Sequence, residues 1–340
     1  SDDLKYATNA SGAWQIHVVD SAGDAGRYAS IALDASGKAH ISYYDVSNSN
    51  LKYATNVTGA WQIHVVDSAG DAGRYASIAL DASGKAHISY YGDSSDDLKY
   101  ATNASGSWQT QIVDSTGNVG TYTSIALDES GKAHISYYDV TNSNLKYATN
   151  ASGSWQIQTV DSDGDVGEHS SIALDASGKA HISYYGDSSD DLKYATNASG
   201  SWQIQIVDSD GEAGSYTSIA LDASGKAHIS YCGNNSLKYA ANVTGSWQAQ
   251  TVDSDEGAGS YTSIALDSSG RAHISYYDAS NDDLKYATET ARPEITDPVI
   301  DNPSPNHDGS RGGSSSSGCF INSLQASKEW FQRFFRGMDR

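Results

Sequence analysis

Residues 30–45 read Ser-Ile-Ala-Leu-Asp-Ala-Ser-Gly-Lys-Ala-His-Ile-Ser-Tyr-Tyr-Asp, and close copies of this stretch recur along the chain. Its His-Ile-Ser-Tyr segment begins at His40, His87, His134, His181, His228 and His273. Successive copies are 47 residues apart, except for one interval of 45 residues between the fifth and sixth copies. A fixed period of about 20–50 residues is typical of solenoids, propellers and other repeat arrays. The period therefore indicates a repeat fold.

Each repeat contains four short segments with the composition of β-strands. In the first full repeat these are Ser30–Leu33, Lys38–Tyr44, Leu51–Thr55 and Trp61–Val66, which we term strands a, b, c and d. Turn residues separate them, Asp-Ala-Ser-Gly between a and b and Asn-Val-Thr-Gly between c and d. No part of the repeat has helical periodicity. Four antiparallel strands per repeat of this length predict the blade of a β-propeller.

The segment Ser30–Asp45 resembles the NHL type of propeller repeat. In that type an apolar-Ala-apolar-Asp strand, a Gly turn and a hydrophobic strand ending in Asp form the two inner strands. The 47-residue repeat is also similar to an uncharacterised class of secreted bacterial repeat proteins. The resemblance covers residues 1–288 and implies a secreted, all-β propeller domain.

The order of the strands along residues 1–288 predicts six blades. The chain begins with strands c and d, continues with five complete sets, and ends with a, b and c. We expect Trp14–Val19 to complete the last blade, so that strands from both ends form a clasp and protect the sheet edges. Either Leu4–Thr8 or Leu284–Thr288 then takes the c position of that blade.

The first residues, Ser1–Leu4, repeat Ser95–Leu98 from inside another copy. We therefore expect further residues upstream in the native chain, and with them a seven-bladed ring is the alternative.

The composition is acidic, with 42 Asp and Glu against 21 Lys and Arg and a net charge of -21. Such a surface repels phosphate backbones, which argues against nucleic-acid binding and favours cations or neutral ligands. The two cysteines, Cys232 and Cys319, lie far apart, so we expect no disulfide framework. No apolar run approaches the roughly 20 residues of a membrane-spanning helix.

Variation between the copies is concentrated in the b–c and d–a loops, which share one rim of a propeller. The b–c loop Asp45–Asn50 differs from Gly92–Asp97, and Cys232–Ser236 is a shortened form, whereas the a–b and c–d turns hardly change. Binding sites on a rigid scaffold usually lie in such loops. The alternative is that these long loops drift neutrally.

An aromatic residue precedes each strand a, namely Tyr28, Tyr75, Tyr122, His169, Tyr216 and Tyr261. Because strand a lines the central channel, we expect these residues to ring one mouth of it and to bind the ligand. Aromatic faces beside Asp, Asn and Ser suit a neutral sugar. The alternative is that the rings only pack and stiffen the d–a loops. His169, next to Glu168, marks one blade interface as different.

The d–a loop richest in acids predicts a metal site at Asp161, Asp163, Asp165 and Glu168. Hard oxygen ligands at alternate positions around a Gly turn suit Ca²⁺. Val166 stands where a calcium-binding loop has Gly, so solvated turn acids are the alternative.

Residues that recur in every copy are more typical of architecture than of function. We therefore expect the histidines of strand b to be hydrogen-bonding partners between blades, and the tryptophans of strand d to anchor blade packing. No Ser-His-Asp or Cys-His set is recognisable, and the arginine cluster of a sialidase is not met. The sequence thus favours a binding protein over an enzyme.

The repeat pattern stops after Thr288. Residues 289–318 hold all four prolines and a Gly-Ser run, which predict a flexible linker. Residues 319–340 form a short amphipathic tail containing Cys319, with the composition of a segment that binds a membrane surface. Docking to a partner protein and a disordered end are the alternatives.

Together these features predict an extracellular or cell-surface bacterial binding module. We expect multivalent carbohydrate binding through the face formed by the b–c and d–a loops, with a glycan or another cell-surface ligand as the partner. The alternatives are a glycan-active hydrolase or lyase, and a structural scaffold without a ligand.

Overall fold

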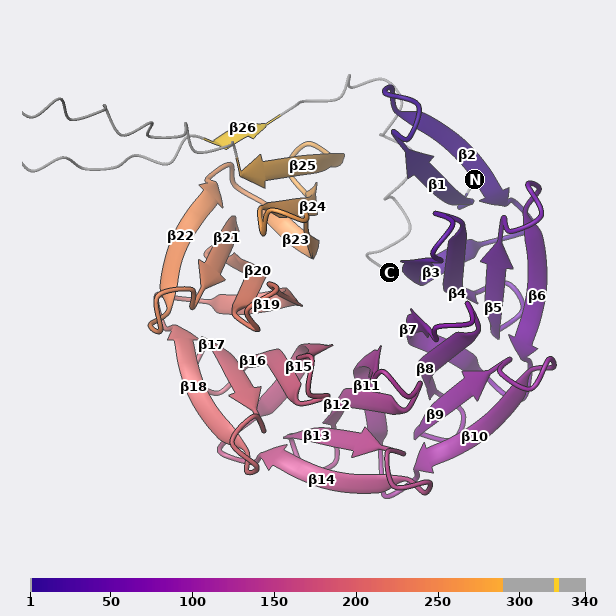
Figure 1. Cartoon of the computed structure of the whole chain (residues 1–340), viewed down its shortest axis with the longest axis horizontal. Helices are drawn as coiled ribbons and strands as arrows, with labels where there is room; N and C mark the ends of the chain where they lie inside the picture. Colours follow the sequence, from indigo (N-terminus) through magenta and orange to yellow (C-terminus); the bar gives the residue numbers. More distant parts are fainter. Residues whose placement is uncertain (1, 290–320, 324–340) are drawn as a thin grey trace, which may run out of the picture.

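The computed structural model describes residues 2–289 and the backbone of residues 321–323. The described strands form six four-stranded sheets around a central axis, a six-bladed β-propeller (Figure 1). This confirms the predicted fold class. Within the described part of the chain, no helix is long and apolar enough to cross a membrane.

The strands of each blade run antiparallel from the axis outward. The a strands are β3 (Ala25–Leu33), β7 (Ala72–Leu80), β11 (Val119–Leu127), β15 (Val166–Leu174), β19 (Ala213–Leu221) and β23 (Ala258–Leu266). The b strands are β4 (Ala39–Asp45), β8 (Ala86–Gly92), β12 (Ala133–Asp139), β16 (Ala180–Gly186), β20 (Ala227–Gly233) and β24 (Ala272–Asp278). The c strands are β5 (Asn50–Thr55), β9 (Asp97–Thr102), β13 (Asn144–Thr149), β17 (Asp191–Thr196), β21 (Ser236–Ala241) and β25 (Asp283–Glu289). The d strands are β6 (Gln62–Asp67), β10 (Gln109–Asp114), β14 (Gln156–Asp161), β18 (Gln203–Asp208) and β22 (Gln248–Asp253). The remaining strands are β1 (Leu4–Thr8), β2 (Gln15–Asp20) and β26 (Ile321–Ser323).

Side-chain hydrogen bonds explain why the two tight turns hardly vary. In the a–b turn of the third blade, the carboxylate of Asp128 accepts the backbone N–H groups of Ser130 and Lys132 at 2.8 and 2.9 Å. In the c–d turn of the same blade, Asn150 Oδ1 accepts the N–H of Ala133 at 2.8 Å. Asp and Asn close turns in this way because their short side chains reach nearby backbone groups.

Strand a is longer than the sequence predicts, because it begins before the aromatic residue. In β11 the pairing with β12 shifts twice, between Val119 and Thr121 and between Thr121 and Ser124. Such β-bulges re-aim side chains. Tyr122 therefore lies inside strand a rather than in the preceding loop.

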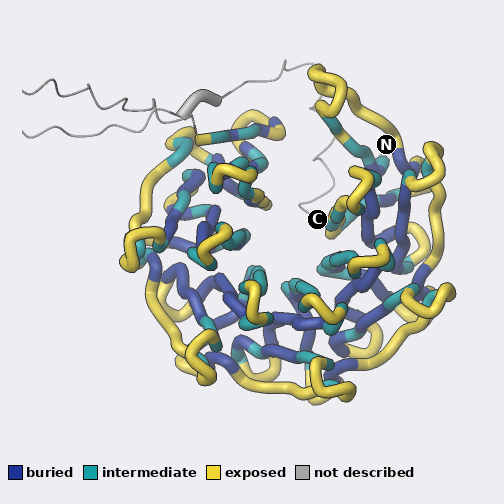
Figure 2. The backbone as a smooth tube through the Cα atoms, viewed as in Figure 1, coloured by how far each residue is buried: buried dark blue, intermediate teal, exposed yellow. Residues whose placement is uncertain are grey.

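The hydrophobic core lies between neighbouring blades. One cluster joins Leu98 of β9 and Val113 of β10 in the second blade to Ile125 of β11 and Ile135 of β12 in the third. All seven residues of β12 are buried, whereas the first four of β14 are exposed. Figure 2 shows the same gradient around the ring, with buried middle strands and exposed outer strands.

Five of the six recurring tryptophans anchor a blade to its neighbour, as the sequence predicts, whereas Trp14, before β2, is 61% exposed. The ring of Trp155 meets Tyr100 of the preceding blade edge-on at 5.2 Å. Its Nε1 donates a hydrogen bond to Gln111 Oε1 of that blade at 3.1 Å. The contact recurs at Trp61, Trp108, Trp202 and Trp247.

The described strands from the two ends of the chain do not share a blade. β1 pairs with β2 in a separate two-stranded sheet beside β3 (Figure 1), and the fourth strand next to β25 is β26. The expected clasp through Trp14–Val19 is therefore not formed. A tight turn, in which the Gly12 N–H donates to the Asn9 carbonyl at 2.8 Å, makes β1 the nearest partner of β2.

Candidate functional site

The six aromatic residues of the a strands meet at one mouth of the central channel. They line a single cavity of about 330 Å³. From Tyr28 around to Tyr261, neighbouring ring centroids lie 4.4–4.8 Å apart. We call this group the aromatic collar, and its members are Tyr28, Tyr75, Tyr122, His169, Tyr216 and Tyr261. The collar brings together every ligand-binding residue that the sequence predicts, in one site rather than six.

The backbone holds the collar residues in an unusual conformation. All six have a positive φ, between 50° and 54°. This region disfavours bulky L-residues and costs on the order of 1–3 kcal/mol per residue. A glycine two positions earlier, such as Gly120 with a φ of 106°, lets the strand bulge and turn each ring towards the axis. Strain of this kind concentrates at functional sites.

The cavity is lined by neutral side chains although the protein is strongly acidic. Behind the collar, each a strand adds small residues, such as Ala76 and Ser77 in β7 and Thr123 and Ser124 in β11. Among the described residues that line the cavity, none is a carboxylate, lysine or arginine. The site therefore offers aromatic faces and hydroxyl groups without a fixed charge.

Burial keeps the side chains of Tyr75, Tyr122 and His169 uncharged over the physiological pH range. Burial, followed by the neighbouring Tyr28, raises the pKa of Tyr75 to about 12. Burial also raises the pKa of Tyr122 well above its usual value, and Tyr75 and Glu168 add to this shift. Burial lowers the pKa of His169 to about 4, so its imidazole carries no charge at neutral pH.

The residue that precedes each collar member in the sequence varies between blades. The sequence analysis named Glu168 but did not compare this position across all the copies. These residues are Arg27, Arg74, Thr121, Glu168, Ser215 and Ser260. Arg74 forms ion pairs with Asp71 at 3.0 Å and Asp93 at 3.4 Å, and its guanidinium lies 5.7 Å from the ring centroid of Tyr44. A variable position at a fixed place in an otherwise constant repeat is the signal that would have found this set.

The d–a and b–c loops share one rim, as the sequence predicts. In the fourth blade, the N–H of Asp165 donates to Ser188 Oγ of the b–c loop at 2.7 Å. The carboxylate of Asp165 also accepts the hydroxyl of Tyr138, from the preceding blade, at 2.6 Å. These contacts fix the loops around the collar.

The acids predicted to bind calcium have different partners. Asp161 accepts hydrogen bonds from Tyr184 at 2.8 Å and from Lys193 at 3.2 Å. Glu168 is half-buried, and burial, Asp187 and Asp165 raise its pKa. Within the described residues, no group of three or more His, Cys, Asp or Glu is arranged to hold a metal ion. Calcium binding therefore stays a prediction.

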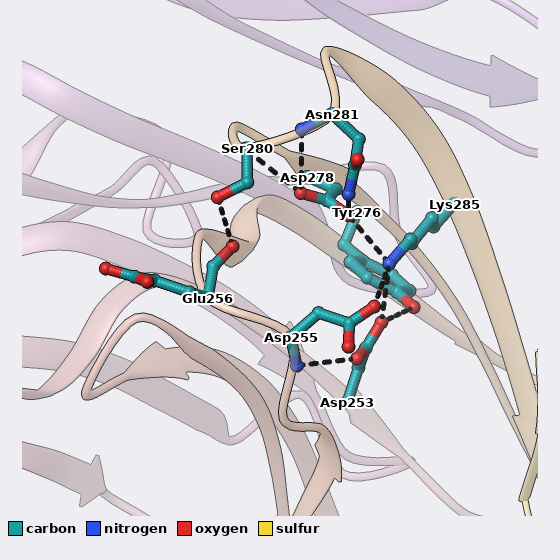
Figure 3. A network of polar contacts seen from close by, with 8 residues as sticks. All are labelled: Asp253, Asp255, Glu256, Tyr276, Asp278, Ser280, Asn281 and Lys285. Carbon is teal, nitrogen blue, oxygen red and sulfur yellow. Dashed lines mark hydrogen bonds and ion pairs between the residues drawn. The ribbon is translucent and has the colours of Figure 1, made fainter. Parts of the chain in front are cut away.

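A buried network at each blade interface was missed by the sequence analysis. In the last copy (Figure 3), Asp253 at the end of β22 accepts the hydroxyl of Tyr276 at 2.7 Å and pairs with Lys285 at 3.1 Å. Lys285 also pairs with Asp255 and Asp278. Burial alone lowers the pKa of Lys285, but these carboxylates outweigh it and raise the pKa above its usual value. The Asp that ends strand d in every copy was the available signal.

The recurring histidines of strand b are structural, but their partners lie within one blade rather than between blades. His87 Nδ1 meets the hydroxyl of Tyr100 at 2.5 Å, and its Nε2 lies 3.6 Å from the carboxylate of Asp81. Asp81, His87 and Tyr100 come from the a–b turn, strand b and strand c of the second blade. The expectation of bonds between blades was therefore wrong.

Comparisons with solved structures support the propeller fold. A lectin from Aleuria aurantia in complex with Fucα1-6GlcNAc has a TM-score of 0.55 and 13% identity, covering 78% of this chain and 92% of the lectin. A protein of unknown function from Dyadobacter fermentans has a TM-score of 0.55 and 12% identity, covering 75% and 90%. A polysaccharide lyase that acts as an ulvan lyase has a TM-score of 0.54 and 14% identity, covering 76% and 78%. At these identities the likeness shows the fold alone.

No protein-family model matches the chain, and no curated protein matches its sequence. The resemblance to NHL repeats therefore stays a prediction, while the propeller itself is established. The predicted linker over 289–318 lies outside the described residues except for Glu289, which belongs to β25, and so does the tail over 319–340 except for the backbone of β26.

Proposed function

We propose that this protein binds a neutral carbohydrate at the aromatic collar. The observation that carries the proposal is the uncharged cavity of about 330 Å³, lined by six aromatic side chains and by serine and threonine hydroxyls. A sugar ring presents apolar C–H faces and hydroxyl groups, which match stacking surfaces and neutral hydrogen-bonding groups. The volume lies at the lower end of ordinary ligand pockets and suits one or two sugar units.

Because the six rings share one cavity, the collar supplies one site per molecule. Multivalent binding would then rest on the repeated b–c and d–a loops around the collar, such as the loop in which Asp165 accepts the hydroxyl of Tyr138. The lectin and the lyase with a similar fold support a glycan ligand, since both are described as acting on carbohydrates.

We place this activity outside a bacterial cell, on the resemblance to secreted propeller repeats. In this proposal the tail over residues 319–340 tethers the propeller to a membrane surface or a partner protein. Calcium at the loop of Asp161 to Glu168 is part of the same proposal, and the binding assay tests it directly.

The test is a glycan array with the full chain, run with calcium and with a chelator. We expect binding to neutral glycans, and loss of it in a variant carrying Tyr75→Ala and Tyr216→Ala. The control variant carries Trp14→Ala, which removes an exposed aromatic side chain outside the collar. No signal above background in either condition would contradict the proposal and favour the alternative of a structural scaffold without a ligand.

A glycan-active hydrolase or lyase is the second candidate. Glu168 favours it, because this half-buried carboxyl has a raised pKa and adjoins the collar at His169. A raised pKa allows a carboxyl to act as a general acid. Turnover of a polysaccharide panel by the wild type, abolished by Glu168→Gln, would support this function over simple binding.

A further inference from the structure

His169 is the only member of the aromatic collar that is not tyrosine. Its ring lies between Tyr122 and Tyr216, at centroid distances of 4.4 and 4.5 Å. Its side chain lines the cavity, no described residue hydrogen-bonds its ring nitrogens, and these nitrogens are open to the cavity rather than buried. His87 in strand b, by contrast, lies away from the cavity, with Nδ1 bonded to the Tyr100 hydroxyl and Nε2 buried 3.6 Å from the Asp81 carboxylate.

A partly buried imidazole without a protein partner needs a physical explanation. Tyrosine occupies the same place in five other blades at the same φ, so the fold does not require histidine there. The unmade hydrogen bonds of His169 therefore point to a partner that enters the cavity.

The chemistry of a neutral imidazole defines that partner. With no charge at neutral pH, His169 offers one N–H donor and one nitrogen acceptor side by side. A sugar hydroxyl can both accept and donate, so one or two hydroxyls match this pair. Imidazole also reaches less far than phenol because it lacks the para hydroxyl, which leaves a recess in the collar for a substituent of the sugar.

We propose that His169 is the specificity-determining residue of the collar, hydrogen-bonding a hydroxyl or hydroxymethyl group of a neutral sugar and fixing its orientation. This inference rests on the proposed function. A collar of six tyrosines would present the same ring and hydroxyl to a sugar at every step from Tyr28 to Tyr261. One imidazole makes a single position along the collar different and selects one orientation of the sugar, and with it one configuration of hydroxyl groups.

The first variant is His169→Tyr, which restores the residue found in the other blades and should leave the fold intact. The probes are the methyl glycosides of glucose, galactose, mannose and fucose, titrated by calorimetry into the full chain. For the glycoside that the wild type prefers, we expect His169→Tyr to weaken binding about tenfold, or about 1.4 kcal/mol. Preference among the four glycosides should flatten at the same time.

The double variant His169→Tyr with Tyr216→His moves the imidazole to the neighbouring blade. It should recover affinity and preference over the single variant, because the collar repeats and only the position of the recess changes. Monodeoxy analogues of the preferred glycoside provide a readout that a merely structural role would not move. Removing one particular hydroxyl should weaken binding to the wild type strongly and binding to His169→Tyr very little.

The outcomes separate the two proposals. Wild-type binding that His169→Tyr leaves unchanged in affinity and preference overturns the role of His169 but keeps the collar as a glycan site. Absence of binding by the wild type to every glycoside and to the array overturns both. The melting temperature of each variant verifies that the propeller is folded.

Discussion

Single residues in this propeller divide by whether the repeat preserves them. The Asp at the end of strand d recurs in each copy because it holds a Tyr and a Lys of the next blade. In the third interface, Asp114 accepts the hydroxyl of Tyr137 at 2.7 Å and pairs with Lys146 at 2.9 Å. His169, in contrast, occurs once and has no such duty. Recurrence thus separates residues that hold the blades together from those free to serve a ligand.

Replacing Asp114 with Asn tests the structural half of this division. Burial alone raises the pKa of Asp114, but bonds from Tyr137 and Lys146 outweigh it, so the carboxylate is ionised and engaged. Lys146 would still pair with Asp139 at 3.3 Å, so the variant would not leave a buried charge without a partner. We therefore expect a moderate loss of about 2 kcal/mol in the free energy of unfolding. Urea denaturation measures it. Asp163→Asn, in an exposed loop, removes the same charge and should cost much less than that.

Among the elements, strand a carries the site, and it departs most from the sequence prediction. The alternation Ser-Ile-Ala-Leu correctly predicts its second half, Ser124–Leu127 in the third blade. The alternating pattern does not predict the bulge or the positive φ of Tyr122, because a bulge inserts a residue and shifts the two-residue period. The Gly two residues earlier was the visible sign of this bulge.

Gly120→Ala tests how tightly strand a is held. Gly120 has a φ of 106°, and an added Cβ would lie 2.7 Å from the backbone Cα of Leu98 in the preceding blade. The backbone of Leu98 cannot move aside as the end of a flexible side chain could. We therefore expect a loss of about 3 kcal/mol in the free energy of unfolding. Gly153→Ala is the matched control, since its φ is 95° and nothing lies within 4 Å. It should cost about 1 kcal/mol, from the conformation alone. Equal losses in the two variants would contradict close packing of the blades at Gly120.

At the scale of the whole molecule, the repeat predicts the blades well and the ends poorly. Strand count and turn chemistry establish four strands per blade, because each turn is closed by local hydrogen bonds that the sequence displays. The closure depends instead on a choice between β1 and β25, which share the sequence Leu-Lys-Tyr-Ala-Thr. Identical strands offer β2 the same partner atoms, so sequence alone does not decide between them. The sequence predicts each of the six collar residues. That they line one shared cavity depends on how the blades are arranged around the axis.

The dependence of stability on pH is a property of the whole ring. Burial lowers the pKa of His40, His87, His134 and His181 below 6.5, so the unfolded chain binds protons first as the pH falls. Stability should therefore decline as the pH drops below 6.5 towards the folded-state pKa values. The interface carboxylates of Asp114, Asp208 and Asp253 have folded-state pKa values below 3.8 despite their burial. Their contribution is present above pH 3.8 and is lost as the pH falls through those lower values.

General charge repulsion predicts the opposite trend, which makes the experiment decisive. Acidification titrates away a net charge of -21, and relief of self-repulsion alone would stabilise the compact state. We expect the melting temperature, followed by circular dichroism at constant ionic strength, to fall in two phases between pH 7 and pH 2, the second of them below pH 3.8. A melting temperature that rises between pH 6.5 and pH 4 would mean that overall repulsion outweighs the buried histidines. His87→Gln should shrink the first phase and leave the second in place, because it removes one buried imidazole and none of the interface carboxylates.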